Sequence, residues 1–406
     1  MEILRNVLGD VLKPVLRKVA EGLQSPILLT VVYTDTQFAF KFKAPATSTL
    51  KIYDGDGTMT AKAGNNTTTV THTTSYAAPG TYYFYVEGDW ADITQIIISV
   101  LFVSGSIDRW GEMINMTWVS VKDTGLYGDI SNLAGLSLFL LSIANTSISG
   151  DISSLRVCTT LAYIQGDHSN VTFDSSLPWV TKVPASFVLH DCEWSCGMVD
   201  NALQAFQNFT STIIIISGNN GIRTDASDDA VISLITNTNK FAVREVSSVG
   251  TLGVELHTDA NAASDPNGNE TDAITGWSQT GLTTGDNEFI SQAIDKAEGS
   301  FAFKVNANPT PTANSSISKG FSTTISSFYR AKFDIKHIGI GANWTLKVDT
   351  KLIFYLYISD TEYFANTLYI PATEETMDFL FQEIGTTNDG GLYLDNFSLR
   401  EVTLPE

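Results

Sequence analysis

The feature that most constrains this chain is an internal repeat near its middle. A Gly-x-Ile triplet begins at Gly105, Gly128 and Gly150, so successive copies are 23 and 22 residues apart. Polar pairs follow nearly the same step, at Asp123-Thr124, Asn145-Thr146 and Asn170-Val171. A period of about 20 to 50 residues is typical of solenoids, whose units bury apolar side chains only against their neighbours. The period therefore predicts a stacked array over residues 104–246.

The most regular unit of the array is NLAGLSLFLLSIANTSISGDISSL, from Asn132 to Leu155. This unit resembles bacterial and phage leucine-rich repeats, in which each turn contributes one strand and stacks an inner Asn or Thr ladder. The following segments, VDNALQAFQNF, TIIIISGNNGIRT, DASDDAVISLITNTN and KFAVREV, read as helix, strand, helix and strand. They resemble the C-terminal cap of leucine-rich-repeat proteins from Bacteroidetes and their phages. The resemblance implies a short solenoid closed by a βα unit.

Cysteine and histidine residues gather at the end of the array. His168 lies upstream of His190, Cys192 and Cys196. A Cys-x3-Cys spacing with one nearby histidine matches no standard structural zinc motif, so we favour buried cysteines that pack as small apolar side chains. Three cysteines in 406 residues do not form a disulfide framework, although a single Cys192–Cys196 bridge stays open.

Residues 27–103 alternate apolar and polar side chains in short runs separated by turn residues, which predicts a small β-sandwich. The segment DGDGT from Asp54 to Thr58 and the segment PGTYYFYV from Pro79 to Val86 resemble the PKD-like immunoglobulin sandwiches of extracellular and phage proteins. Asp54 and Asp56 lack the further oxygen ligands of a calcium loop. We therefore interpret Asp-Gly-Asp-Gly as a type I′ hairpin turn.

Residues 255–406 form another series of alternating strands. They open with GNETDAITGW, from Gly268 to Trp277, and close with GGLYLDNFSLREV, from Gly390 to Val402. These segments resemble the jelly rolls of carbohydrate-binding modules. The resemblance implies one structural calcium ion that joins the opening segment to the last strand, with Glu270 and Asp395 as its nominated ligands. It also implies that Trp277 anchors the core.

Three aromatic residues of this last region are candidates for stacking on sugar rings: Trp344, Tyr355 and Tyr357. Tyr355 and Tyr357 share one face of a strand, because side chains two apart point the same way. One face of each jelly-roll strand is buried between the sheets, and the sequence leaves open which face that is. Burial in the core is thus an equal alternative to ligand binding.

Residues 1–25 predict an amphipathic helix with its apolar stripe on one face. The stripe comprises Leu4, Val7, Leu8, Val11, Leu12, Val15, Leu16 and Val19. Charged residues interrupt it, so no uninterrupted apolar segment of an export signal is present, and Pro14 should kink the helix. Three roles fit such a helix: packing on the chain's own core, contact with a lipid surface and docking into a larger assembly. We favour docking, because the β region begins directly afterwards.

Composition and missing motifs disfavour nucleic-acid-binding proteins and several classes of enzyme. With 24 Lys and Arg against 44 Asp and Glu, the formal net charge is −20, which disfavours nucleic acid as a partner. The sequence contains no HExxH, GxSxG, P-loop or Rossmann glycine pattern, so we expect a non-enzymatic protein. The expected fold class is mainly β and multidomain.

Our leading hypothesis is a bacteriophage structural protein, a spike or a head or tail fibre, assembled in the host cytoplasm and displayed on the virion surface. Its N-terminal helix would bind other virion proteins, and its outer domains would bind a host-surface glycan or protein. Such proteins are usually symmetric, so we expect a homo-oligomer, as a trimer or another cyclic assembly. The alternatives are a secreted or cell-surface adhesin of a Bacteroidetes bacterium and a carbohydrate-active enzyme.

Overall fold

The computed structural model describes residues 25–34, 37–180, 184–245, 251–255, 278–280, 289–292, 302–306, 316–338, 343–349, 351–356, 364–384 and 391–404. The chain divides into two compact units, Met1–Cys192 and Glu193–Glu406. This boundary lies inside the region 104–246, between its repeats and its helix-strand segment. In the described part of the chain, no helix is long and apolar enough to cross a membrane. The predicted helix of residues 1–25 lies outside the described residues, except for Ser25.

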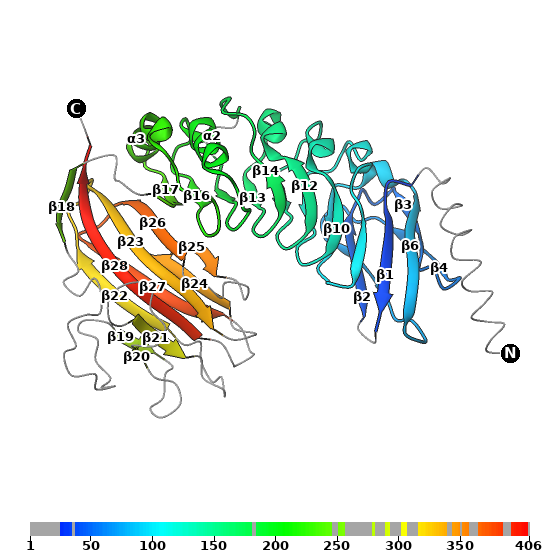
Figure 1. Cartoon of the computed structure of the whole chain (residues 1–406). Coiled ribbons are helices and arrows are strands. Elements are labelled where there is room, and N and C mark those ends of the chain that lie inside the picture. The colour runs from blue at the N-terminus through cyan, green and yellow to red at the C-terminus, as the bar shows by residue number, and fades with distance from the viewer. Residues whose placement is uncertain are drawn as a thin grey trace. The chain divides into compact units, whose positions relative to one another are not determined.

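The first unit is built from two β-sheets (Figure 1). The first sheet has eight strands, in the order β14 (Asn170–Thr172), β12 (Ser147–Asp151), β10 (Gly125–Asp129), β8 (Val103–Ser106), β1 (Leu28–Tyr33), β6 (Gly80–Gly88), β3 (Thr49–Tyr53) and β4 (Met59–Ala63). The second sheet has the order β15 (Ser186–Val188), β13 (Tyr163–Gln165), β11 (Leu140–Ser142), β9 (Trp118–Ser120), β7 (Gln95–Ile97), β2 (Phe38–Lys43) and β5 (Val70–Thr74). Short 3-10 helices lie in the connections: η1 (Trp90–Asp92), η2 (Trp110–Glu112), η3 (Ile130–Leu133) and η4 (Ile152–Val157).

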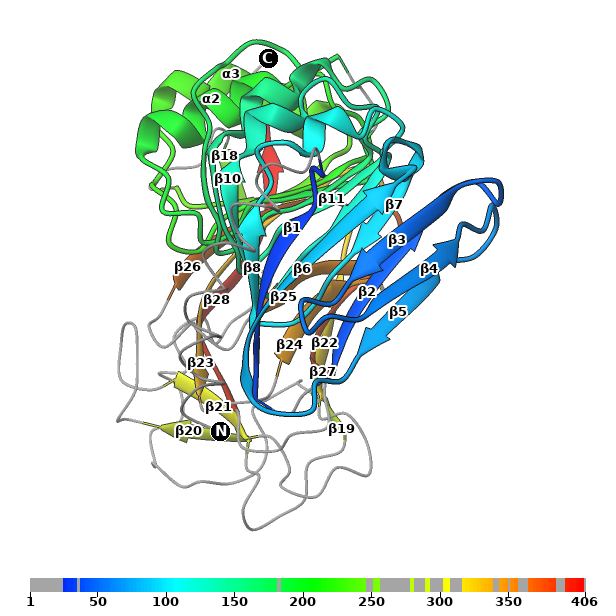
Figure 2. The same ribbon diagram turned by 90° about the vertical axis from the view of Figure 1, so that its right-hand side faces the viewer.

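Both sheets change from antiparallel to parallel pairing without a break. In the first sheet β1 pairs antiparallel with β6 and β8, whereas β8, β10, β12 and β14 pair in parallel. In the second sheet β2 pairs antiparallel with β5 and β7, and parallel pairing then runs from β7 to β15. Figure 2 shows β1, β6 and β8 in one layer and β2, β5 and β7 in the other. The predicted sandwich and the predicted repeats therefore share two sheets, and the sandwich covers the first edge of the array.

Alternation along the strands sends apolar side chains into one continuous core. In the sandwich, Phe84 contacts Phe38 and Phe40 with ring centroids 5.0 and 5.2 Å apart. In the repeats, the second residue of each of six strands points inward, and the set is buried: Val119, Leu141 and Ile164 from the second sheet, and Leu126, Ile148 and Val171 from the first. Each repeat therefore contributes two strands, one to each sheet, and the expectation of one strand per turn was wrong.

Each repeat forms one turn of the array, which we call a coil. The repeated glycines provide room for an aspartate from the preceding coil. Gly128 and Gly150 have φ angles of 122° and 96°, which only glycine adopts without strain. A Cβ atom on Gly128 would lie 2.6 Å from Asp108 Oδ1, and one on Gly150 would overlap the carboxylate of Asp129. The carboxylate of Asp129 also accepts a hydrogen bond from Ser131 N at 2.9 Å, which caps η3.

A polar turn follows each strand of the repeat part of the second sheet. Its first residue has a left-handed backbone: φ is 57° at Asp123, 56° at Asn145 and 50° at His168. Asn145 Nδ2 donates to Asp123 Oδ1 at 3.0 Å, which links neighbouring coils. The third polar pair is therefore His168-Ser169, and our sequence assignment of Asn170-Val171 was wrong, because Asn170 already begins β14.

The interpretation of Asp-Gly-Asp-Gly as a two-residue type I′ turn was also wrong. Tyr53 pairs with Met59, so residues 54–58 form a longer connection between β3 and β4. Gly55 and Gly57 supply positive φ angles of 81° and 99°. The connection is a hairpin loop held by Thr58, whose hydroxyl donates to Asp56 Oδ1 at 2.6 Å.

The second unit combines a βα segment with a β-sandwich. The segment contains α2 (Cys196–Phe206), β16 (Ile213–Ile216), η5 (Asp225–Ser227), α3 (Asp228–Thr236) and β17 (Lys240–Val243), which confirms the predicted order of helix, strand, helix and strand. β16 and β17 are parallel, and β17 pairs antiparallel with β26 of the sandwich. Phe241 stacks on Tyr369 at this junction, with ring centroids 4.8 Å apart. The βα segment thus extends one sheet of the sandwich.

The sandwich of the second unit has antiparallel strands in two sheets. The third sheet continues from β17 through β26 (Phe364–Pro371), β23 (Phe328–Ile338), β28 (Gly391–Thr403), β21 (Ala302–Asn306) and β20 (Phe289–Gln292), with β18 (Thr251–Glu255) also paired to β28. The fourth sheet has the order β19 (Ser278–Thr280), β22 (Ser316–Ser322), β27 (Thr376–Ile384), β24 (Asn343–Val348) and β25 (Lys351–Leu356). Phe397 lies 5.2 Å from Phe379 and 5.7 Å from Phe321 between ring centroids. The expectation of a mainly β protein with jelly-roll-like sheets is confirmed, whereas the leucine-rich-repeat family stays a prediction.

Candidate functional site

The repeat part of the second sheet presents a regular outer face. Val119, Leu141 and Ile164 point into the core, so the residues on either side of them point out of the sheet. The register places Trp118, Leu140 and Tyr163 directly opposite one another on β9, β11 and β13. Because neighbouring strands lie about 4.8 Å apart, these side chains form a closely spaced row across the sheet.

Three aromatic side chains on this face, Trp118, Phe139 and Tyr163, form what we call the aromatic row. Phe139, which directly precedes β11, is 43% exposed, and Tyr163 is 39% exposed. The ring centroid of Phe139 lies 6.4 Å from that of Trp118 and 5.5 Å from that of Tyr163. Neighbouring exposed aromatic rings are uncommon on a soluble protein and indicate an interaction surface.

The sheet fixes the position of the aromatic row. Phe139 N donates to Thr117 O at 2.7 Å, and Phe139 O accepts from Ala162 N at 2.9 Å and Tyr163 N at 3.1 Å. These hydrogen bonds tie the backbone of Phe139 to the coils before and after it. The row is therefore preorganised, and little conformational entropy is lost when a ligand binds.

Polar side chains flank the aromatic row. Two strand positions further on, Ser142 Oγ donates to Gln165 Oε1 at 3.2 Å. Gln165 Nε2 in turn donates to Asp167 Oδ2 at 3.3 Å. Aromatic rings beside amide and hydroxyl groups combine an apolar stacking surface with hydrogen-bonding partners.

The polar groups at the end of the array are buried and paired. His190 Nε2 lies 2.6 Å from Asp191 Oδ2, and His168 Nε2 lies 3.6 Å from the same oxygen. Cys158 and Cys192 are buried as expected, but Cys196 is exposed, and all three thiols are free. Burial raises the pKa of Cys158 to about 11. Within the described residues, His, Cys, Asp and Glu side chains form no cluster of three suited to a metal ion.

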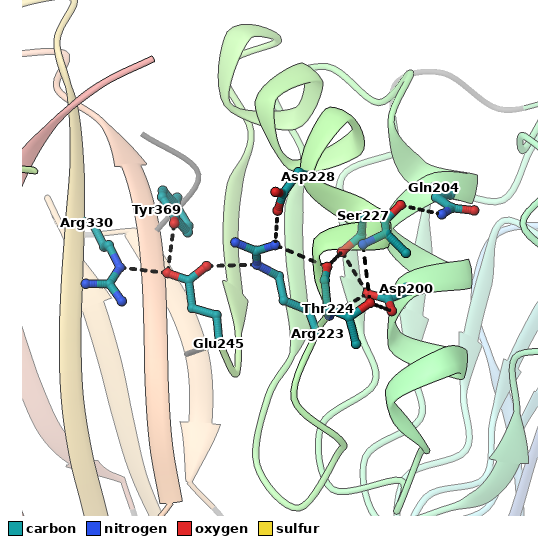
Figure 3. A network of polar contacts seen from close by, with 10 residues as sticks. Asp200, Gln204, Arg223, Thr224, Ser227, Asp228, Glu245, Arg330 and Tyr369 are labelled. Carbon is teal, nitrogen blue, oxygen red and sulfur yellow. Dashed lines mark hydrogen bonds and ion pairs between the residues drawn. The ribbon is translucent and has the colours of Figure 1, made fainter. Parts of the chain in front are cut away.

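A second charged cluster lies inside the second unit (Figure 3). Glu245 accepts from Arg330 Nε at 2.7 Å, from Tyr369 Oη at 2.8 Å and from Arg223 Nε at 2.8 Å. The side chain of Glu245 is only 1% exposed. Arg223 also pairs with Asp228 at 2.6 Å. Since the charges are paired and the side chains of Arg223, Glu245 and Arg330 are buried, we interpret this cluster as a structural link between the βα segment and the sandwich.

The structure does not bring the sequence-predicted site residues into one site. Trp344 and Tyr355 lie on the paired strands β24 and β25, where their backbones are described and their side chains are not. Tyr357 and Glu270 lie outside the described residues, as does Trp277. Asp395 lies on β28 opposite Asp334 of β23, and its side chain is not described. The sugar-stacking and calcium assignments therefore stay predictions.

Sequence reasoning missed the aromatic row, although a signal for it exists. Trp118, Leu140 and Tyr163 are 22 and 23 residues apart, the same steps as the repeated glycines. Each also precedes a buried residue of a three-residue strand. A search for aromatic residues one or two repeat steps apart would have found Trp118 and Tyr163.

Comparisons with known proteins place the chain in no family. No family model matches it, and no curated protein is similar. Among solved structures, TmCBM61 in complex with β-1,4-galactotriose is 14% identical, with 36% of this chain and 98% of that chain covered at a TM-score of 0.27. The CBM22-1 xylan-binding domain from Paenibacillus barcinonensis is 12% identical, with 39% and 100% covered at a TM-score of 0.25. A putative sugar binding protein from Bacteroides thetaiotaomicron is 13% identical, with 36% and 100% covered at a TM-score of 0.26. Likenesses at this level establish no shared activity.

Proposed function

We propose that this chain is a non-enzymatic recognition protein whose aromatic row binds a neutral glycan chain. The observation that carries the proposal is the contact of Trp118, Phe139 and Tyr163 on one open sheet face. Sugar rings have apolar faces that pack on aromatic rings, and their hydroxyl groups exchange hydrogen bonds with amides and hydroxyls such as those of Gln165 and Ser142. An open face suits a chain ligand better than an enclosed small molecule.

Charge favours a neutral ligand. The formal net charge of −20 repels polyanions at long range, which disfavours nucleic acids and acidic polysaccharides alike. The aromatic row itself contains no charged side chain. A neutral polysaccharide of a cell surface is not repelled by the net charge and needs no charged side chain in the row for binding.

The wider proposal is that the chain belongs to a virion spike or fibre and presents this face, on a leucine-rich-repeat array, to a host surface. The apolar stripe of residues 4–19 supports attachment to other virion proteins, since it supplies a docking face in front of the β region. The adhesin of a bacterial surface is the alternative that uses the same glycan-binding face. Both roles predict binding without cleavage.

Substitutions in the aromatic row test the glycan proposal. We expect Phe139→Ala and Tyr163→Ala each to weaken binding to a neutral polysaccharide by about tenfold or more, because each removes one stacking surface worth about 1.4 kcal/mol. Affinity electrophoresis against a panel of neutral polysaccharides measures the effect. Leu177→Ala is the matched control, because Leu177 is 56% exposed in the same unit and outside the row.

Two outcomes contradict the proposal. One is full retention of polysaccharide binding by the Phe139→Ala, Tyr163→Ala double variant with an unchanged circular dichroism spectrum. The other is release of new reducing ends from the polysaccharide during incubation, which would favour the carbohydrate-active enzyme.

A further inference from the structure

A cleft of about 420 Å³ opens on the outer face of the first sheet, where β10, β8, β1 and β6 lie side by side. Its shape follows from side-chain size along two neighbouring rows across the sheet. Tyr127 of β10 pairs with Ser106 of β8, and Thr30 of β1 pairs with Ser104 on one side and Tyr83 on the other. Serine and threonine therefore form a low floor between two tyrosine walls.

A glycine of β8 lies beneath the floor of the cleft. Gly105 lies between the two serines, and a Cβ atom there would lie 2.6 Å from Leu28 O. β8 and β1 therefore approach closely only because this residue has no side chain. The cleft lies within the first unit, and its volume is in the range of small-molecule sites, about 300–1,000 Å³.

Hydroxyl groups dominate the interior of the cleft. Within the described part of the chain, the hydroxyls of Thr30, Ser104, Tyr83 and Tyr127 have no hydrogen-bond partner, and all four residues line the cleft. Each hydroxyl can both donate and accept. Tyr127 is 48% exposed, so its ring presents an apolar surface beside these groups.

The charged groups at one end of the cleft are held by the protein itself. Asp108 Oδ2 accepts from Ser106 Oγ at 2.7 Å, and Asp108 Oδ1 accepts from Asp129 N at 2.9 Å. The guanidinium of Arg109 makes a two-pronged ion pair with Glu112, with both N to O distances at 2.8 Å. One cation among these two carboxylates leaves a negative balance, which disfavours an anionic ligand.

We infer that this cleft is a second, independent binding site that takes a single neutral sugar residue. The tyrosine walls pack against the apolar face of the ring, and the four hydroxyls donate to and accept from the hydroxyls of the sugar, whereas Asp108 only accepts from them. The site differs from the aromatic row in size, in sheet and in residues, and it does not depend on the row.

Saturation-transfer difference NMR on the full chain tests this inference with a panel of glucose, galactose, mannose and N-acetylglucosamine, and with glucose 6-phosphate as the anionic comparator. We expect saturation transfer to at least one neutral sugar and weaker transfer to the phosphate. Ser104→Phe, which fills the floor, and Tyr127→Ala, which removes a wall, should each reduce that transfer about tenfold or more. Val32→Phe is the matched control, because Val32 is 47% exposed on the outer face of β1 and does not line the cleft.

Each outcome decides for or against the cleft. The Phe139→Ala, Tyr163→Ala variant should keep the monosaccharide signal, and a signal lost there but kept in Ser104→Phe would assign the sugar to the aromatic row and overturn the inference. The inference is also overturned if no sugar of the panel receives saturation, or if glucose 6-phosphate binds more strongly than every neutral sugar. Loss of polysaccharide binding with a preserved monosaccharide signal would concern the aromatic row alone.

Discussion

Asp54 is a buried carboxylate in the hairpin loop between β3 and β4. His72 Nε2 lies 2.7 Å from its Oδ1, Thr58 Oγ1 donates to its Oδ2 at 3.1 Å, and Tyr76 Oη donates to its main-chain oxygen at 2.9 Å. Burial alone would raise the pKa of Asp54, but hydrogen bonds to His72 and Thr74 outweigh it and hold the pKa below its ordinary value. The ionised form therefore stabilises the fold.

The sign of this effect gives a pH prediction for a single residue. A lowered pKa contributes stability above the unfolded pKa, about 3.9, and that stability is lost as pH falls through the folded value. We expect Asp54→Asn to lower the free energy of unfolding by about 1–3 kcal/mol at pH 7, with the difference from wild type shrinking below about pH 4. Urea denaturation across pH 3–7 measures it.

The matched control for Asp54 is Asp56 in the same loop. Asp56 is exposed and contacts only Thr58 among the interactions described, so Asp56→Asn should change stability much less. Equal destabilisation by both variants at every pH would contradict the prediction. It would show that the loss in free energy of unfolding comes from changing the loop and not from the buried carboxylate of Asp54.

At the scale of the element, the coil depends on its glycine. We expect Gly150→Ala to destabilise the protein by about 1–3 kcal/mol, because alanine is strained at a φ of 96° and its methyl group would overlap the carboxylate of Asp129. Gly135→Ala is the control, since a Cβ atom there meets nothing within 4 Å. Chemical denaturation followed by circular dichroism compares the two, and equal midpoints would refute the packing argument.

The repeats were predictable because successive coils place a glycine at the same structural position. Gly128 and Gly150 recur where the chain turns against an aspartate of the preceding coil, so their spacing reveals the array. A structural feature whose residue type changes from one repeat to the next leaves no such periodic pattern in the sequence. The aromatic row uses tryptophan at 118, leucine at 140 and tyrosine at 163, and Phe139 reaches the row from a position outside its strand.

The cleft could not be inferred from sequence for a different reason. Tyr83 and Tyr127 belong to strands separated by two others in the first sheet, and antiparallel pairing of β1 with both β6 and β8 brings them to one surface. Register between non-consecutive strands is set by the packed core, and no local pattern encodes it. The same holds for Glu245, whose partners Arg330 and Tyr369 come from distant strands.

At the scale of the whole molecule, residues before Ser25 are expected to serve attachment. Ser25 itself belongs to the folded unit: it is buried, its hydroxyl donates to Val86 O, and its carbonyl accepts from Arg109 Nη1 at 3.1 Å. A deletion that removes residues 1–24 should therefore leave a folded, soluble protein with unchanged glycan affinity that is no longer incorporated into particles. Circular dichroism, polysaccharide binding and co-sedimentation with particles measure the three properties.

A deletion that is two residues longer tests whether Ser25 contributes to the stability of the first unit. Removing residues 1–26 eliminates Ser25 and its contacts with Val86 and Arg109, so this variant should unfold at a lower temperature than the shorter one. Aggregation of the shorter deletion would show instead that the apolar stripe packs on the protein's own core. Undiminished incorporation would remove the proposed role of residues 1–25.

Because every coil adds one strand to each of the two sheets, the length of the array changes in steps of one coil. Among the described strands, each coil pairs with the coils before and after it, so a duplicate of residues 128–149 inserted after position 149 would meet matching neighbours on both sides. Every such insertion would lengthen the array by about 4.8 Å, the spacing of paired strands, and would move the N-terminal sandwich one step further from the last repeat. Selection can thus adjust the length of the first unit in whole coils without changing the residues of the sandwich.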